Sequence, residues 1–137
     1  ARPAVGSWCR LFSHAMAEFV HLHVHTQYSL LDSALKVKDL VKRTAAAGMK
    51  AVAMTDHGNM FGAITFYKAA KDAGVQAILG CELEVLTTLA GAPRMVHLPL
   101  LASSLEGYRN LVWLVSRGHV RETPNPAIPV PYVTLDE

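Results

Sequence analysis

The sequence predicts an α/β fold built around a parallel sheet. Two short runs, MKAVAMTDHG and VQAILGCELEV, are apolar without the alternation of a half-buried strand, which is typical of parallel strands covered on both faces. Segments with helical spacing alternate with these runs. A strand–helix–strand order with short connections forms parallel sheets, whose functional residues gather at the carboxyl ends of the strands.

The elements follow one another closely along the first half of the chain. We expect a first strand over 19–25, then a loop and a helix within SLLDSALKVKDLVKRTAAAG that stops at Gly48. MKAVAMTDHG predicts the second strand. A second helix is expected over about 62–73, ending at Gly74, and VQAILGCELEV predicts the third strand.

The second half is less regular. ELEVLTT and RMVHLPLLA predict strands separated by the turn LAGAPR, and SLEGYRNLVWLVSRG predicts a helix with Leu111, Leu114 and Val115 facing inward. A proline-rich connector, TPNPAIPVP, follows. Three or four parallel strands leave their last faces uncovered. We therefore expect residues 18–137 to be a truncated part of a larger barrel or sheet. The patterned sequence begins just after Met16, so an amino-terminal extension is expected over 1–17.

Composition excludes several classes of function. Of the 137 residues 51% are hydrophobic and 18% charged, which is typical of a globular fold, and the net charge of +2 is too weak to hold nucleic acid by charge alone. No apolar run approaches the roughly 18 residues of a membrane span. Cys9 and Cys81 form no CxxC pattern, so a reducing, cytoplasmic location is expected. Neither a P-loop nor a GxSxG elbow is found.

The stretch HLHVHT carries the first chemical signal. His21, His23 and His25 alternate, so in a strand they share one face. A single histidine is more often a satisfied core or surface residue. An HxH pair at the end of a strand instead favours metal binding, because two neutral imidazoles on one face can hold one ion.

Acidic and imidazole side chains also end the next two strands. Asp56 and His57 close the second predicted strand, and Glu82 lies near the end of the third. Parallel strands bring their carboxyl ends together, so all these residues are expected at one rim with the histidines. Such a set without thiolate suits zinc, manganese or iron, and mixed carboxylate and imidazole ligands suit a cluster of two or three ions.

Two further residues have two interpretations each. Asp32 follows the histidines in the loop SLLDSA and either closes over the same rim or serves as a helix amino-terminal residue. His97 is the only polar side chain in an apolar run and is equally consistent with a core histidine and a ligand. His14 and His119 are expected to be ordinary solvated residues, and Cys81 a small buried hydrophobe.

Three stretches together carry a resemblance to a known family. FVHLHVHTQYSLLDSA, AVAMTDHGNMFGAITFYKAAKDAGVQAILGCELEV and LLASSLEGYRNLVWLVSRG resemble the amino-terminal PHP domain of bacterial DNA polymerase III alpha subunits, from about Glu18 to the end. The resemblance implies a distorted seven-stranded β/α barrel that holds up to three metal ions at the carboxyl ends of its strands.

The resemblance also assigns roles residue by residue. It implies that metal ligands are His23, His25, Asp32, His57, Glu82 and His97. Asp56 and His21 are expected to support and orient neighbouring ligands. The family's later cysteine or histidine ligand and its closing Asp-x-His pair are not in this chain, so we expect the chain to be inactive on its own.

The implied function is that of a piece of a replicative DNA-directed DNA polymerase. The PHP module would be a phosphoesterase with a zinc or manganese cluster, possessing 3′–5′ exonuclease activity, while magnesium would serve the polymerase site of the parent. Implied partners are DNA, deoxynucleotides, a proofreading exonuclease subunit and a sliding clamp, with no membrane. The alternatives are a structural module that docks the proofreading subunit and a stand-alone phosphatase such as histidinol phosphatase.

Overall fold

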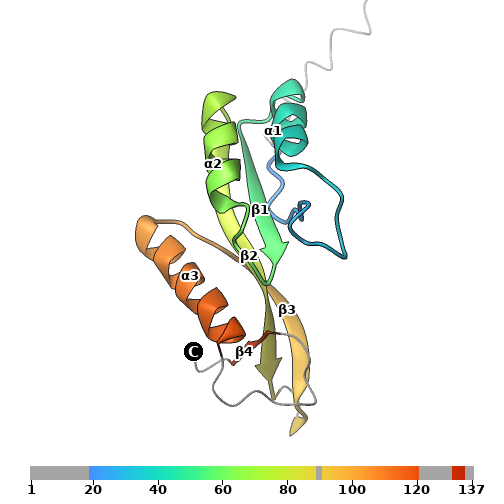
Figure 1. The fold of residues 1–137 in the computed structure, drawn as a ribbon, viewed down its shortest axis with the longest axis vertical. Coiled ribbons are helices and arrows are strands. Elements are labelled where there is room, and N and C mark those ends of the chain that lie inside the picture. The colour runs from blue at the N-terminus through green and yellow to red at the C-terminus, as the bar shows by residue number, and fades with distance from the viewer. Residues whose placement is uncertain (1–18, 89–90, 121–130, 135–137) are drawn as a thin grey trace, which may run out of the picture.

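Figure 1 shows the computed structural model, which describes residues 19–88, 91–120 and 131–134. Within these residues, three helices and a mixed four-stranded sheet form an elongated arrangement (Figure 1). In chain order the elements are α1 (Val37–Ala46), β1 (Ala51–His57), α2 (Ala63–Asp72), β2 (Gln76–Thr87), β3 (Arg94–Leu101), α3 (Leu105–His119) and β4 (Val133–Thr134). The extension predicted over 1–17 lies outside the described residues.

The predicted parallel strand pair is confirmed. β1 and β2 are joined through α2 and pair in parallel from Ala51 opposite Gln76 to His57 opposite Glu82. Every residue of β1 before His57 is buried, as the unbroken apolar run predicted. The register therefore places the carboxyl end of β1 beside the middle of β2.

β2 is longer than predicted, because the segments expected as two strands, VQAILGCELEV and ELEVLTT, form one strand of 12 residues. Its second half extends past the end of β1. There β3 runs antiparallel along one edge and β4 pairs in parallel at Val85 and Leu86. β3 pairs with residues of β2 that also pair with β1 or with β4. β1 and β4 therefore both lie along the edge of β2 that faces away from β3.

The strand predicted over 19–25 is not formed as a regular strand. Only His21 makes a bridge, in parallel to Val52. The amide of Ala53 donates to His21 O, and the amide of Thr55 donates to Val24 O. The two acceptors are three residues apart, whereas the two donors on β1 are only two residues apart. One extra residue interrupts the ladder in the manner of a bulge, and the Thr55 hydroxyl accepts the hydrogen bond of the Val24 amide.

The helices lie where the periodicity predicted them. Val37, Leu40 and Val41 of α1 pack with Phe66 of α2 against Val52 of β1, forming the first part of the core. Gly48 and Gly74, with φ of 71° and 69°, turn the chain out of α1 and α2. Of the three residues expected to face inward on α3, Leu111 is buried, and Leu114 and Val115 pack against the second half of β2.

The two faces of the sheet differ in character. Val52 and Met54 on β1 and Leu83 and Val85 on β2 belong to the core clusters that the helices complete. His57 and Glu82 point to the other face, because side chains alternate along each strand. The described residues thus have a mixed α/β fold with a chemically distinct face; the seven-stranded barrel stays a prediction. None of the described helices is long and apolar enough to span a bilayer.

Candidate metal centre

The β-sheet register brings four chemically active side chains onto one face. Glu82 and Glu84 are two residues apart in β2 and therefore point the same way. His57 at the end of β1 is paired with Glu82, and His97 on β3 is paired with Glu84. Residues paired across neighbouring strands share a face, so two carboxylates and two imidazoles meet there.

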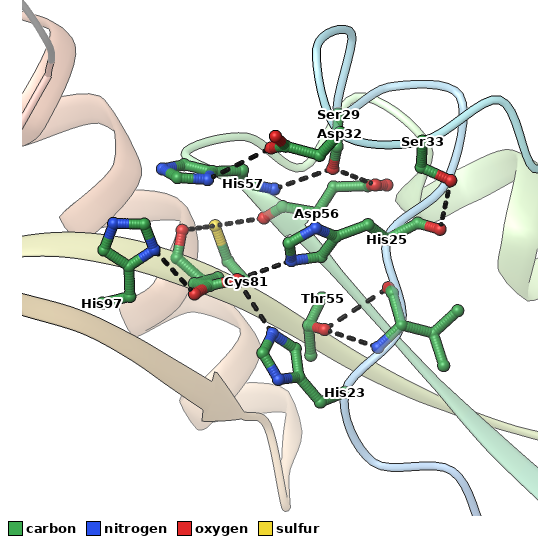
Figure 2. A network of polar contacts seen from close by, with 12 residues as sticks. His23, His25, Ser29, Asp32, Ser33, Thr55, Asp56, His57, Cys81 and His97 are labelled. Carbon is green, nitrogen blue, oxygen red and sulfur yellow. Dashed lines mark hydrogen bonds and ion pairs between the residues drawn. The ribbon is translucent and has the colours of Figure 1, made fainter.

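The first ligand group consists of His23, His25 and Glu82. Oε2 of Glu82 lies 2.8 Å from Nε2 of His23 and 2.5 Å from Nε2 of His25. The two imidazole rings meet edge to face, with centroids 5.1 Å apart. Figure 2 shows both rings reaching from the amino-terminal segment toward the strands. One carboxylate oxygen is thus shared by both histidines of the HxH pair.

The second ligand group consists of His57, Glu84 and His97. Oε1 of Glu84 lies 3.0 Å from Nε2 of His57 and 3.0 Å from Nε2 of His97. Asp32 approaches from the loop, with its Oδ2 3.5 Å from Nδ1 of His57 (Figure 2). The second group therefore repeats the first, with one glutamate oxygen between two imidazoles and an additional carboxylate nearby.

His97 joins the two groups. Its Nδ1 lies 3.0 Å from Oε1 of Glu82, and its Nε2 contacts Glu84. The two carboxylate oxygens of Glu82 consequently face different groups, Oε2 the first and Oε1 the imidazole of the second. A carboxylate in this position can bridge two metal ions.

Glu82 is the most buried of these candidate ligands, with 4% of its surface exposed. Burial raises the pKa of its carboxyl, but the hydrogen bonds and charge interactions with His23 and His25 outweigh burial and leave the pKa lowered. The side chain is therefore held as a carboxylate, which is the form that binds a cation.

Asp56 faces away from this cluster and holds the loop that follows His25. It is fully buried, and its carboxylate accepts hydrogen bonds from the Thr26 amide (2.6 Å), the Thr26 hydroxyl (2.7 Å) and the Ser29 hydroxyl (2.7 Å). Ser29 Oγ in turn accepts from the His57 amide at 3.1 Å. Asp56 thus connects the segment carrying His25 to the strand end carrying His57 (Figure 2).

Three other residues considered in the sequence, His21, Cys81 and His119, lie outside the two ligand groups. The exposed His21 has its ring beside that of Phe19, with centroids 4.8 Å apart, and belongs to neither ligand group. The extra residue between His21 and Val24 separates it from the face of His23 and His25. Cys81 is fully buried, as expected. Nε2 of His119, at the end of α3, lies 2.8 Å from Gly58 O, next to the centre.

The donor set fits divalent metal ions. In each group the candidate ligand atoms lie within 4.8 Å of one another. Two ligand atoms of a tetrahedral zinc ion lie about 3.3–3.5 Å apart, so small side-chain rotations would bring these atoms onto one ion. Imidazole nitrogen with carboxylate oxygen is a ligand set for zinc, manganese or iron. The arrangement offers two adjacent sites that share Glu82 and His97.

Glu84 was not among the site residues predicted from the sequence. Its signal was present in the letters ELE, because the same two-residue period that grouped His23 with His25 places Glu84 on the face of Glu82. The antiparallel register that sets Glu84 opposite His97 also explains why His97 reaches the centre.

Comparison of the chain with models of known protein families identifies its family. A family model described as "PHP domain" matches residues 21–134. The chain belongs to the PHP domain family. The match includes every residue of both ligand groups and all four strands.

Relatives of this PHP domain include large bacterial polymerases. The chain is 48% identical over 107 residues to the DNA polymerase III subunit alpha of Helicobacter pylori, covering 74% of the chain and 9% of that protein. It is 44% identical over 113 residues to that of Treponema pallidum (77% and 10%). It is 45% identical over 106 residues to an error-prone DNA polymerase of Symbiobacterium thermophilum (77% and 9%). The chain therefore spans about a tenth of the length of these relatives.

Solved structures with the same architecture include two described as hydrolytic enzymes. An amidohydrolase from Chromobacterium violaceum, solved with bound sulfate and no metal, has a TM-score of 0.54 at 25% identity, over 72% of this chain and 34% of that one. A putative metal-dependent phosphoesterase from Bifidobacterium adolescentis has a TM-score of 0.55 at 21% identity, over 75% and 35%. The second likeness concerns the fold alone.

Proposed function

We propose that this PHP domain is part of a DNA polymerase III alpha subunit. The identities of 42–48% to six proteins of that name support the assignment. The whole protein would then be a replicative, cytoplasmic DNA-directed DNA polymerase that uses DNA, deoxynucleotides and magnesium at a separate site. A proofreading exonuclease subunit and a sliding clamp would be its partners.

Within that protein, we propose that the PHP domain is a metal-dependent phosphoesterase acting on DNA ends as a 3′–5′ exonuclease. One observation carries the proposal: Glu82 and Glu84 each present one oxygen to two imidazoles, and Glu82 faces both groups. Paired sites of this kind suit phosphodiester hydrolysis, in which the attacking and the leaving oxygen both carry negative charge.

Each residue has a definite task in this proposal. His23, His25 and Glu82 would hold one zinc or manganese ion, and His57, Glu84 and His97 a second. Asp32 would orient His57 or complete the second site, and Asp56 would fix the loop between the groups. Bound ions would activate water and offset charge on the phosphate oxygens. His21, which pairs with Val52 of β1, would help to position the segment that carries His23 and His25.

The proposal is tested on the full-length protein that contains this chain, without a proofreading subunit and without deoxynucleotides. A His23→Ala/His25→Ala variant is expected to lose one bound ion and to degrade single-stranded DNA at least about 100-fold more slowly. A Lys38→Ala/Lys42→Ala variant, changed on the exposed face of α1, is the control and should match the wild type.

Two other results would each reject catalysis by this centre. If the double histidine variant loses metal and thermal stability but retains full nuclease activity, the metal has a structural role and the domain serves as a docking module. If it retains both metal and activity, these histidines are not ligands.

A further inference from the structure

A cavity of about 440 Å³ opens directly beside the candidate metal centre. His57 and Glu84 of the second ligand group, with Asp32 beside them, form part of its wall. Its volume lies within the range of about 300–1,000 Å³ that is usual for small-molecule sites. A phosphoester bound at the second group would therefore have room for one of its substituents in this cavity.

Much of the remaining wall is apolar and open to solvent, although Ser29, Asn59 and His119 also line it. Leu30 and Leu31 lie at the tip of a turn closed by the hydrogen bond from the Asp32 amide to Ser29 O, and they are 86% and 98% exposed. Phe61 is 74% exposed. Turn tips favour small polar residues, so large apolar side chains gathered at the mouth of one cavity indicate a surface that contacts something else.

The apolar wall is tied to the metal centre by Asn59, which is 7% exposed. Its Nδ2 donates to Tyr28 O at 3.0 Å and to His57 O at 2.9 Å, and its Oδ1 accepts from the Phe61 amide at 3.2 Å. One buried side chain thus fixes the loop, the ligand His57 and the aromatic Phe61 relative to one another. The backbone segments that carry the wall of the cavity are consequently held in place relative to one another.

The charges around the cavity restrict its occupant. Among the described residues, no lysine or arginine lines it, whereas Asp32 and Glu84 do. A single phosphate can be held where metal ions offset these carboxylates, but a second phosphate deeper in the cavity would meet only the His119 imidazole as a possible cation. The lining therefore favours a ligand whose part beyond the phosphate is uncharged.

We infer that this cavity holds the terminal nucleoside of a DNA strand, with its base against Phe61 and the two leucines and its 5′-phosphate at His57, Glu84 and His97. The inference rests on the proposed phosphodiester hydrolysis and names its specificity site. Stacking of a base on an aromatic ring is worth about 1–3 kcal/mol and tolerates any base. The site would thus recognise a strand end without reading its sequence.

Two substrates that share a leaving group test this inference on the metal-loaded full-length protein. Thymidine 5′-(p-nitrophenyl phosphate) carries a nucleoside, and methyl p-nitrophenyl phosphate carries a methyl group in its place. Phe61→Ala is expected to raise KM for the thymidine ester about tenfold, leave kcat within about twofold, and leave the methyl ester unaffected. Tyr67→Ala, which removes an exposed aromatic ring of α2 outside the cavity, is the control.

Binding of thymidine 5′-monophosphate, measured by isothermal titration calorimetry in the presence of manganese, separates the failure of the inference from that of the proposed function. If the protein hydrolyses neither ester, the proposed function fails, and the inference then stands if Phe61→Ala alone weakens this binding about tenfold. Equal effects of Phe61→Ala and Tyr67→Ala, an equal effect on both esters, or unchanged nucleotide binding would overturn it.

Discussion

Glu84 on β2 and His97 on β3 are directly paired in the antiparallel register, with Oε1 of the glutamate 3.0 Å from Nε2 of the histidine. Two residues earlier, Glu82 makes the same kind of contact to the same ring through Nδ1. One histidine on a hairpin strand thereby links two carboxylates that strand alternation had already placed on one face.

Replacing Glu84 with glutamine should remove the second ion and leave the first group intact. The amide loses the negative charge of the oxygen that faces His57 and His97, so the affinity of the second group for zinc should fall at least about 100-fold. Equilibrium dialysis against zinc measures this effect. Glu106→Gln, in the exposed first turn of α3, should change nothing. Equal zinc binding by Glu84→Gln and the wild type would exclude Glu84 as a ligand.

Asp56→Asn should destabilise the fold. The buried carboxylate accepts three hydrogen bonds, and an amide would set its own N–H groups against the donors of Thr26 and Ser29. We expect the free energy of unfolding to fall by about 2–3 kcal/mol, measured by urea denaturation of the metal-free protein. Asp72→Asn, at the exposed end of α2, should stay within about 0.5 kcal/mol of the wild type. A similar stability for both variants would contradict the anchoring role of Asp56.

Two glycines should respond to alanine with opposite signs. A Cβ at Gly80 would lie 2.6 Å from Leu100 O, which is backbone of the neighbouring strand and cannot move aside cheaply. Gly80→Ala should therefore cost about 2 kcal/mol or more of unfolding free energy. In α3, a Cβ at Gly107 would come no closer than 3.5 Å to Ala102, and Gly107→Ala should add about 0.5–1 kcal/mol. Thermal unfolding of the two variants checks the packing of β3 on β2.

Cys81 should resist alkylation while the protein is folded. Burial raises the pKa of its thiol to about 12, whereas an ordinary cysteine thiol ionises near pH 8.5–9. Iodoacetamide at pH 8.5 should thus modify Cys81 in urea-unfolded chain but not in native protein, as followed by peptide mass spectrometry. Because folding raises this pKa, the neutral Cys81 thiol makes its full contribution to the free energy of unfolding below about pH 9. That contribution is lost as the pH rises toward 12. Rapid labelling of the native protein would show that Cys81 is accessible.

The local pattern predicted most of the fold because burial in this chain follows regular periods. The unbroken apolar run of β1 predicted a buried strand, and the spacing of Leu40 and Val41 predicted a helix. The structure confirms both. The bulge between His21 and Val24 could not be predicted, since it depends on a hydrogen bond to Thr55, 31 positions away. The pairing of β4 with β2 likewise joins segments far apart in sequence.

The candidate site divides in the same way. His23, His25, His57 and Glu82 were found because strand ends and two-residue periods are visible in the letters. Whether His97 was a core histidine or a neighbour of the other candidates depended on the β2–β3 register, which no local pattern encodes. Glu84 was also predictable from its spacing to Glu82, since both lie in the predicted strand VQAILGCELEV, but only Glu82 was predicted as a site residue.

If Glu82 joins two metal sites, its replacement should empty both of them, and the number of bound metal ions measures this effect. The metal-free full-length protein is loaded with zinc, freed of excess ion, and analysed by inductively coupled plasma mass spectrometry beside Glu82→Gln and the control Glu106→Gln. We predict at least about two ions at this centre in the wild type and the control, and less than about one in Glu82→Gln, because Glu82 faces both groups. An unchanged zinc content in Glu82→Gln would show that Glu82 does not join two metal sites.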